Sequence, residues 1–354
     1  MDLLILAGAF ILILAGAELF TNGVEWLGHR LGLGEGAVGS VIAAVGTALP
    51  ETMIPIVAIV LGATSGDSAA SEGIGIGAIL GAPFMLATLA MFVTGVAVLV
   101  FSRQRANRDI LRVDTVILGR DVRAFVVAYA LAIGAAFLPE DLAWGKIVVA
   151  AVLLGLYALY VRAHLRGERT GEQSENLAPL RFRRFARHSH QGEPGLPAIS
   201  LQVAVALGAI IVGAIAFVDA VGTLAGTAGV DPAVMALVIA PIATELPEKF
   251  NSVIWVRQGK DTLALGNITG AMVFQSCIPT VVALLFASEA WAITADSWII
   301  FASAGIAFAS TAAIFVPMVV RRRLTGRGLL VGGAFYVGYL LLLLVGGAGA
   351  AAGH

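Results

Sequence analysis

Long apolar segments separated by short polar ones run along the whole chain. Segments of about 20 apolar residues are long enough for an α-helix to cross the hydrocarbon core of a bilayer. On this basis we expect an all-α polytopic membrane protein with ten transmembrane helices. Their predicted ranges are 2–24, 36–61, 73–100, 122–138, 144–161, 198–223, 232–257, 262–287, 297–319 and 328–348.

The composition agrees with a membrane protein. Of the 354 residues, 59% are hydrophobic and only 13% are charged, whereas a soluble domain carries about 25% charged residues. The single cysteine, Cys277, excludes intrachain disulfides and any cysteine-based zinc site. The apolar run Leu3–Leu14 resembles the core of a signal peptide, but no basic residue precedes it, so we expect a retained first helix.

The charges in the loops predict how the chain crosses the membrane. Loops after the second, fourth, sixth and eighth spans contain no lysine or arginine. By the positive-inside rule, both termini then lie outside the cell membrane, which we expect to be the plasma membrane of a prokaryote. The basic residues lie in the remaining loops, at Arg30, Arg103–Arg123, Arg162–Arg187, Arg257 with Lys260, and Arg321–Arg327.

The chain contains an internal repeat. Val45–Thr52 reads VGTALPET and Ile242–Lys249 reads IATELPEK, and an ungapped shift of 197 positions superposes their shared residues. Five spans separate the two copies, and this odd number makes the repeats inverted, as in many secondary transporters. The predicted organisation is a first five-helix repeat at 1–161, a basic cytoplasmic linker at 162–197, and a second, inverted repeat at 198–354.

Each repeat places a glutamate, Glu51 or Glu248, inside an apolar span. A carboxylate at that depth costs several kcal/mol by the milder estimates and marks a functional site by default. The preceding proline leaves a backbone carbonyl without its donor, and Thr47 and Thr244 add hydroxyls one turn away. Two such clusters would offer the hard oxygen ligands that calcium prefers, or would hold two monovalent ions or protons instead. Antiport requires such exclusive occupancy; the alternative is a buried glutamate that caps a helix break.

The two motifs resemble a known family. GTALPE at Gly46–Glu51 and ATELPE at Ala243–Glu248 are similar to the paired signatures of the cation/calcium antiporter superfamily, the sodium/calcium exchangers in particular. The stretch Ala264–Asn267, followed by Gly270, resembles the second conserved piece of each repeat. This resemblance implies a secondary active antiporter, not an enzyme, that exchanges Ca²⁺ for Na⁺ by alternating access without a cofactor. Spans two, three, seven and eight would hold the ions, and spans one and six would move against them.

The resemblance also assigns residues. It implies that Thr47, Glu51, Thr244 and Glu248 ligate calcium and that the two glutamates also bind the exchanged ions. Asn267 keeps the family's asparagine, and Gln275 is either a ligand or a helix–helix hydrogen-bonding residue. Several sodium ligands are missing, which argues against a three-sodium stoichiometry. The departures from the family pattern are Ala48 and Glu245, Ala82 and Ala271, Leu86 with Gln275, and Ala78 opposite Asn267.

Glu245 and Lys249 are additions to the family pattern. They stand four residues apart with glutamate first, which is the favourable order for a helical ion pair. Either the two charges neutralise each other beside the site, or Glu245 joins the ligands and Lys249 acts as a tethered cation. The fragment ATEL is also similar to the proton-coupled branch of the superfamily. The alternative function is therefore a cation/H⁺ antiporter that moves Ca²⁺ or a monovalent cation.

Polar residues outside the motifs leave two options open. Glu18, Asn22 and Asp219 either line an access path on the cytoplasmic side or act as interfacial caps. In the linker, the pair His188 and His190 is a weak metal motif, and a solvated, flexible segment whose arginines meet anionic lipid headgroups is the preferred interpretation.

The remaining alternatives are functions of other classes. A channel would lack counter-transport, and an intramembrane enzyme would need a catalytic motif that the sequence does not contain. The expected partners are Ca²⁺ with Na⁺ or H⁺ and membrane lipid, with no nucleic acid. The sequence leaves the oligomeric state open, a monomer included.

Overall fold

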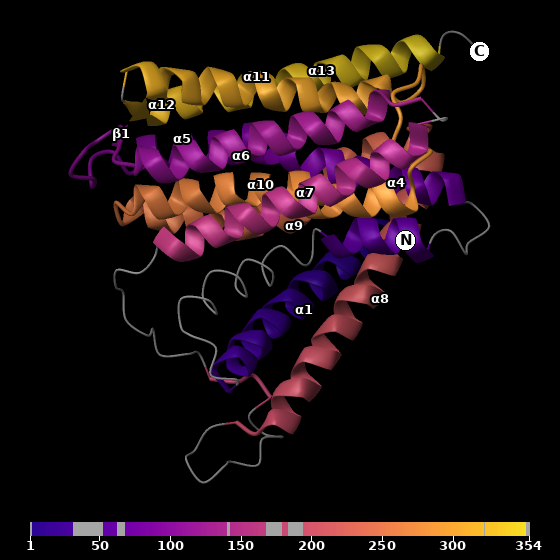
Figure 1. Ribbon diagram of the computed structural model, residues 1–354, viewed down its shortest axis with the longest axis horizontal. Helices are drawn as coiled ribbons and strands as arrows, with labels where there is room; N and C mark the ends of the chain where they lie inside the picture. The colour runs from indigo at the N-terminus through magenta and orange to yellow at the C-terminus, as the bar shows by residue number, and fades with distance from the viewer. Residues whose placement is uncertain are drawn as a thin grey trace.

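The computed structural model describes residues 2–30, 52–61, 68–139, 142–167, 179–182, 194–321 and 323–351. Within these ranges the chain is mainly helical (Figure 1). The helices are α1 (Asp2–Arg30), α4 (Ser68–Met85), α5 (Met91–Val100), α6 (Thr115–Gly134), α7 (Ala143–Gly167), α8 (Leu196–Ala228), α9 (Pro232–Arg257), α10 (Asp261–Phe286), α11 (Trp298–Arg321), α12 (Gly326–Leu329) and α13 (Val331–Ala351). Two π-helical turns, η2 (Val57–Leu61) and η4 (Leu86–Ala90), a 3₁₀ turn η5 (Ala135–Phe137) and the short strands β1 (Ile110–Leu111) and β2 (Leu324–Thr325) complete the described elements.

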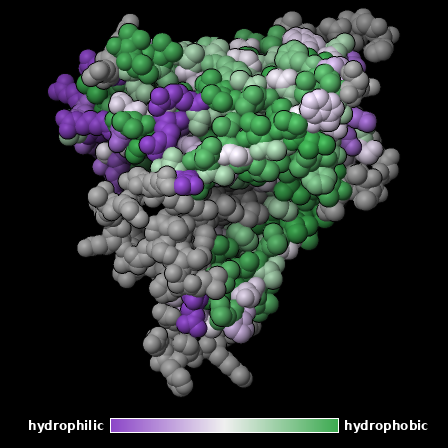
Figure 2. Space-filling model, viewed as in Figure 1, coloured by the Kyte–Doolittle hydropathy of each residue, from purple (hydrophilic) through white to green (hydrophobic). Residues whose placement is uncertain are grey.

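The helices agree with a multi-pass membrane protein. Seven spans in the described part of the chain are long and apolar enough to cross a membrane. Helix α6 is not among them because Arg120, Asp121 and Arg123 fall in its first half. Figure 2 shows hydrophobic side chains over most of the visible bundle and hydrophilic ones gathered at one end. That end carries β1, α12 and the arginine-containing connections (Figure 1).

Most predicted spans have a described helix close to the expected ends. Helix α9 covers the predicted span 232–257, and α10 begins one residue before the predicted 262. Helix α6 begins at Thr115 rather than 122, because the Asp114 carboxylate caps it by accepting from the backbone N–H groups of Val116 and Ile117. The predicted span 36–61 lies outside the described residues except for 52–61. The plan of ten spans in inverted repeats therefore stays a prediction.

Helices α1 and α8 pack side by side and lean away from the remaining bundle (Figure 1). Their contacts are reciprocal. A Cβ at Gly16 would lie 2.8 Å from Cγ1 of Ile210, and a Cβ at Gly213 would lie 2.7 Å from Cγ1 of Ile13. The repeat shift pairs Gly16 with Gly213 and Ile13 with Ile210, so each helix offers the other the same groove and the same ridge.

Helix α4 packs against α9 almost backbone to backbone. A Cβ at Gly77 would overlap the carbonyl oxygen of Ala233, and one at Gly81 would overlap that of Leu237. Small residues allow such close approach in membranes, where helices gain little from burying apolar side chains against one another. The two helices that carry predicted parts of the ion site thus form one tightly packed unit.

The long third span changes its helical winding in the middle. Helix α4 contains Pro83 and passes through the π-helical turn η4 into α5. Two hydroxyl groups bond to backbone carbonyls in this stretch. Thr88 Oγ1 donates to the Phe84 carbonyl at 2.6 Å, and Ser310 Oγ of α11 donates to the Ala87 carbonyl at 2.7 Å. Such π-helical turns are frequent at functional sites.

A buried ion pair fastens the hydrophilic end of the bundle. Arg105, 6% exposed in the α5–α6 connection, lies with its Nη2 2.8 Å from Oδ2 of Asp261 at the start of α10. The same guanidinium donates to the Val256 carbonyl at the end of α9. The Asp261 carboxylate also accepts from the backbone N–H of Arg112 at 2.8 Å. These bonds thereby hold the α9–α10 turn against the α5–α6 connection.

Candidate cation-binding site

The predicted acidic ligands fall where the structure gives no side-chain position. Thr47 and Glu51 lie outside the described residues. Glu245, Glu248 and Lys249 have their backbone in α9, but their side chains are outside the described part. The meeting of Glu51 with Glu248, and the pairing of Glu245 with Lys249, therefore remain predictions.

Thr244 is a described member of the candidate set. Its side chain is 1% exposed, and its Oγ1 donates to the Ala240 carbonyl at 3.0 Å. Helix α9 continues through Pro247, which has no N–H to offer the carbonyl of Ala243 one turn earlier. A hydroxyl oxygen whose hydrogen is engaged and a carbonyl that lacks its usual helical donor thus lie within one turn of each other, and both can serve a hard cation as neutral oxygen ligands.

Gln275 and Asn267 both lie on α10. Gln275 is 2% exposed and Asn267 is half-buried. Helices α9 and α10 are consecutive neighbours, joined by a short turn in which Gly259 has a φ of +78°. Thr244 and Gln275 stand at nearly equal distances along the chain from this turn, so they lie at similar depths. Asn267 lies about 12 Å along the helix from Gln275, nearer the turn.

The corresponding positions of α4 and the π-helical turn η4 carry apolar side chains. Ala78, Ala82 and Leu86 stand where α10 has Asn267, Ala271 and Gln275, and all three are buried. No side-chain oxygen comes from these three positions. The described side chains that could offer a cation an oxygen ligand therefore lie on α9 and α10, and these three positions of the first half offer none.

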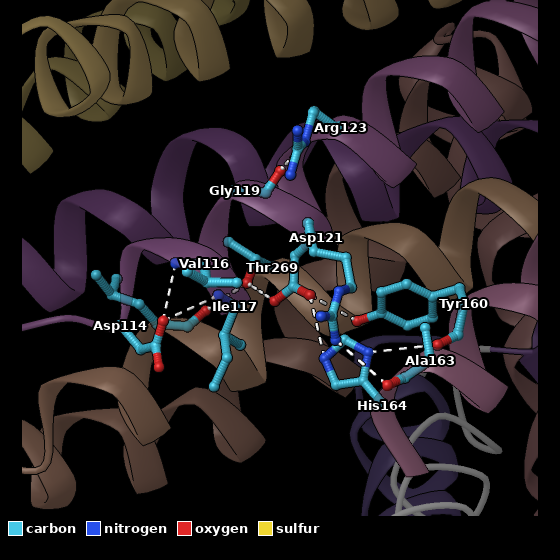
Figure 3. Close-up of polar contacts among 12 residues, drawn as sticks. Asp114, Val116, Ile117, Gly119, Asp121, Arg123, Tyr160, Ala163, His164 and Thr269 are labelled. Carbon is cyan, nitrogen blue, oxygen red and sulfur yellow. Dashed lines mark hydrogen bonds and ion pairs between the residues drawn. The ribbon is translucent and has the colours of Figure 1, made fainter. Parts of the chain in front are cut away.

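A second polar cluster, which sequence reasoning missed, surrounds Asp121 of α6 (Figure 3). Asp121 is 1% exposed, and its Oδ2 accepts from Thr269 Oγ1 of α10 at 2.6 Å. Its Oδ1 accepts from the Tyr160 hydroxyl of α7 at 3.0 Å and lies 3.4 Å from Nε2 of His164. The sequence features that could have indicated this cluster are a lone aspartate at the edge of a predicted span and the spacing of Tyr160 and His164, one helical turn apart.

Polar side chains also join α1 to α8 at their hydrophilic end. Asn22 Oδ1 accepts from Gln202 Nε2 at 3.0 Å and from the backbone N–H of Arg181 at 3.1 Å. Gln202 Oε1 in turn accepts from the N–H of Phe182 at 2.9 Å. Asn22 thus acts as an interhelical anchor. Residues 179–182 of the predicted flexible linker are docked on the helix pair, and buried Leu180 packs with the start of α8; His188 and His190 lie outside the described residues.

Glu18 and Asp219, the other two polar residues predicted outside the motifs, differ from Asn22. Glu18 is exposed and pairs with Arg181 at 2.6 Å, as an interfacial charge would. Asp219 is exposed on α8, and its backbone carbonyl accepts from Thr223 Oγ1.

Long apolar helices, close glycine-mediated packing and buried polar groups within the bundle define a multi-pass helical membrane protein. The sequence model of the family described as sodium/calcium exchanger protein matches residues 1–165 and 199–345. The chain belongs to this family, and the resemblance inferred from the two motifs is confirmed. The match covers both predicted repeats and omits most of the linker.

Solved structures share the fold of this chain. The H⁺/Ca²⁺ exchanger CAX superposes with a TM-score of 0.70 at 15% identity, covering 97% of this chain and 82% of that chain. YfkE gives a TM-score of 0.62 at 12% identity, covering 98% and 100%. The sodium-calcium exchanger NCX_Mj gives 0.54 at 16% identity, covering 96% and 97%. No curated protein sequence matches the chain significantly.

Proposed function

We propose that this protein is a secondary active antiporter that exchanges calcium for sodium ions or protons at a midplane site formed by Glu51 and Glu248. The observation that carries the proposal is the family match over both halves of the chain, each with its own acidic motif. Thr244, the carbonyl of Ala243 and Gln275 would add neutral oxygens on the α9–α10 side. The net charge of two carboxylates suits one divalent ion, two monovalent ions or two protons.

The packing of α1 and α8 supports alternating access. These helices contact each other along their lengths, and the reciprocal Gly16–Ile210 and Gly213–Ile13 contacts make them one unit. This pair packs through a shared apolar core against α4 and α9, which are themselves held backbone to backbone. Movement of the α1–α8 pair across α4 and α9 would expose the site to each side in turn. Such movement between two well-packed bodies is the usual basis of transport in inverted-repeat folds.

Proton coupling is the second candidate, and a specific observation favours it. The buried residues Ala78 and Ala82 of α4 and Leu86 of η4 offer no side-chain oxygen at the positions where the family pattern has sodium ligands. A site with fewer neutral oxygens holds several sodium ions poorly, whereas two carboxylates suffice to bind two protons. The structural likeness to a protein described as an H⁺/Ca²⁺ exchanger is in keeping with this candidate.

Calcium-45 uptake into proteoliposomes tests the proposal. Uptake is measured under an imposed sodium gradient and then under an imposed pH gradient, with calcium the same in both. We expect one gradient to drive uptake and E51Q or E248Q to reduce it to the level of protein-free vesicles. E18Q is the matched control, because Glu18 is an exposed glutamate of a membrane helix that pairs with Arg181. Wild-type uptake by E51Q or E248Q, or uptake independent of both gradients, would contradict the proposal.

A further inference from the structure

We propose that Asp121 is a positioning residue that holds α10 against α6 and α7, and that protonation of His164 strengthens this hold. The proposal rests on the proposed function in one respect, namely that α10 carries Asn267 and Gln275. The cluster joins three helices through four side chains (Figure 3). Asp121 lies on a helix to which the proposed exchange mechanism assigns no ligand.

The link to α10 runs through Thr269. This residue lies on α10 between Asn267 and Gln275, and its Oγ1 is 2.6 Å from Asp121 Oδ2 and 3.1 Å from the Leu265 carbonyl oxygen. A hydroxyl has one hydrogen, and a charged carboxylate takes it in the shorter and stronger bond. While Asp121 is charged, the hydrogen therefore joins α10 to α6 instead of closing a bond within α10.

The link to α7 runs through Tyr160 and His164, one helical turn apart. The Tyr160 hydroxyl donates to Asp121 Oδ1 at 3.0 Å, and Nε2 of His164 lies 3.4 Å from the same oxygen. The His164 side chain is 24% exposed, whereas that of Asp121 is 1% exposed. The imidazole can therefore exchange a proton with water while the carboxylate stays enclosed. The pair is ionic only when the ring is protonated.

The other described groups that face Asp121 are an arginine, a phenol and a hydroxyl. On α6, Arg120 interacts electrostatically with Asp121 and donates to the Ala163 carbonyl of α7 at 3.4 Å. Its guanidinium is charged at every accessible pH, and the phenol of Tyr160 stays protonated through the neutral range. From α10, the described contact is the uncharged hydroxyl of Thr269. The His164 ring is thus the described group of the cluster whose pairing with Asp121 depends on its protonation.

The direction of the effect follows from these contacts. With the ring protonated, the Asp121 carboxylate has a cationic imidazole as well as two hydroxyl donors. As the pH rises and the ring loses its proton, the carboxylate stays buried with a weaker set of partners, because a buried charge depends strongly on its pairing. The hold on α10 is therefore present at low pH and weakens as the pH rises.

The test uses the full chain in detergent and requires no transport. Thermal unfolding followed by tryptophan fluorescence, and hydrogen exchange of α10 and α13 peptides, are measured from pH 5.5 to 8.5. Relative to H164Q, the wild type should melt about 2 °C higher at pH 5.5 and at the same temperature at pH 8.5. Protection of α10, relative to α13 at the same pH, should fall with rising pH in the wild type and remain constant in H164Q.

Three further variants make the result specific. D121N keeps groups able to hydrogen-bond Thr269 and Tyr160 but removes the charge, so it should lose the pH step. Y160F removes a donor but keeps both members of the His164–Asp121 pair, so it should melt lower than the wild type at every pH and still show a pH step. R123Q is the control, because exposed Arg123 bonds only to Gly119 within its own helix among the described contacts. A pH step of wild-type size in H164Q, or an equal step in α10 and α13, would overturn the proposal, and neither result depends on whether the protein exchanges calcium.

Discussion

Gly16 of α1 receives Ile210 of α8, and the same contact recurs with the helices exchanged where Gly213 receives Ile13. A Cβ at either glycine would come within 3 Å of an isoleucine Cγ1 and 3.1 Å from a backbone carbonyl oxygen, of Ala206 or Ala9. Two contacts related by the repeat shift are what a two-fold axis between the helices produces. The interface should therefore respond equally to equivalent changes on its two sides.

The first prediction concerns this interface. Gly16→Leu and Gly213→Leu should each destabilise the protein by about 1–3 kcal/mol, because the added side chain overfills a close helix contact. The two losses should agree with each other. Melting of detergent-solubilised protein, followed by size-exclusion chromatography, measures them. Gly208→Leu is the control, because a Cβ at Gly208 meets nothing within 4 Å; a loss at Gly208 as large as that at Gly16 would show that the effect is unspecific.

The second prediction concerns α4 and α9. Gly77→Ala or Gly81→Ala would place a methyl group on the carbonyl oxygen of Ala233 or Leu237, and backbone cannot yield as a flexible side chain can. We expect a larger loss of stability from one methyl here than from the same change elsewhere. The yield of monodisperse protein and its melting temperature measure this loss. The same change at Gly134 of α6 has open space and should be close to neutral, and a neutral Gly81→Ala would contradict the packing described here.

The third prediction concerns the buried pair of Arg105 and Asp261. Arg105→Met leaves the Asp261 carboxylate buried without its cation, and should cost about 3–5 kcal/mol. Replacing both partners, by Arg105→Met with Asp261→Leu, should recover part of this loss because no charge is left stranded. A double-mutant cycle from thermal melting gives the coupling energy. Arg103→Met is the control, since Arg103 is exposed in the same connection, and additivity of the two changes would refute the coupling.

The fourth prediction concerns Gln275 as an ion ligand. Gln275→Leu retains bulk but removes the carbonyl oxygen, so it should raise the calcium concentration for half-maximal uptake by up to about tenfold, equivalent to about 1.4 kcal/mol. The maximal rate should change less. Ser276→Ala is the control, because Ser276 Oγ is already bonded within α10, to the Met272 carbonyl at 2.6 Å. An unchanged calcium dependence would assign Gln275 to helix packing instead.

The elements that sequence reasoning predicted well are those that a local pattern determines. Apolar length gave the ends of α9 and α10 within one residue. The repeat and its family could be recognised because two copies of one motif support each other. The start of α6 was missed because charged residues in its first half resembled a loop.

The contacts that could not be predicted join residues far apart in the sequence. Asp121 meets Tyr160 across 39 positions and Thr269 across 148, and nothing local to Asp121 indicates either partner. Arg105 was assigned to an exposed basic loop, yet it is buried against Asp261. Charge patterns indicate on which side of the membrane a loop lies, but they do not reveal which of its arginines finds an enclosed partner. The geometry of the two glutamates remains a prediction.

The docking of residues 179–182 onto Asn22 and Gln202 has a mechanical consequence. These residues are bound to α1 and α8 together, so under the proposed mechanism they would move with this helix pair. A fluorophore attached near Arg181 and a second one on α13 would then report displacement of α1 and α8 relative to the remaining helices.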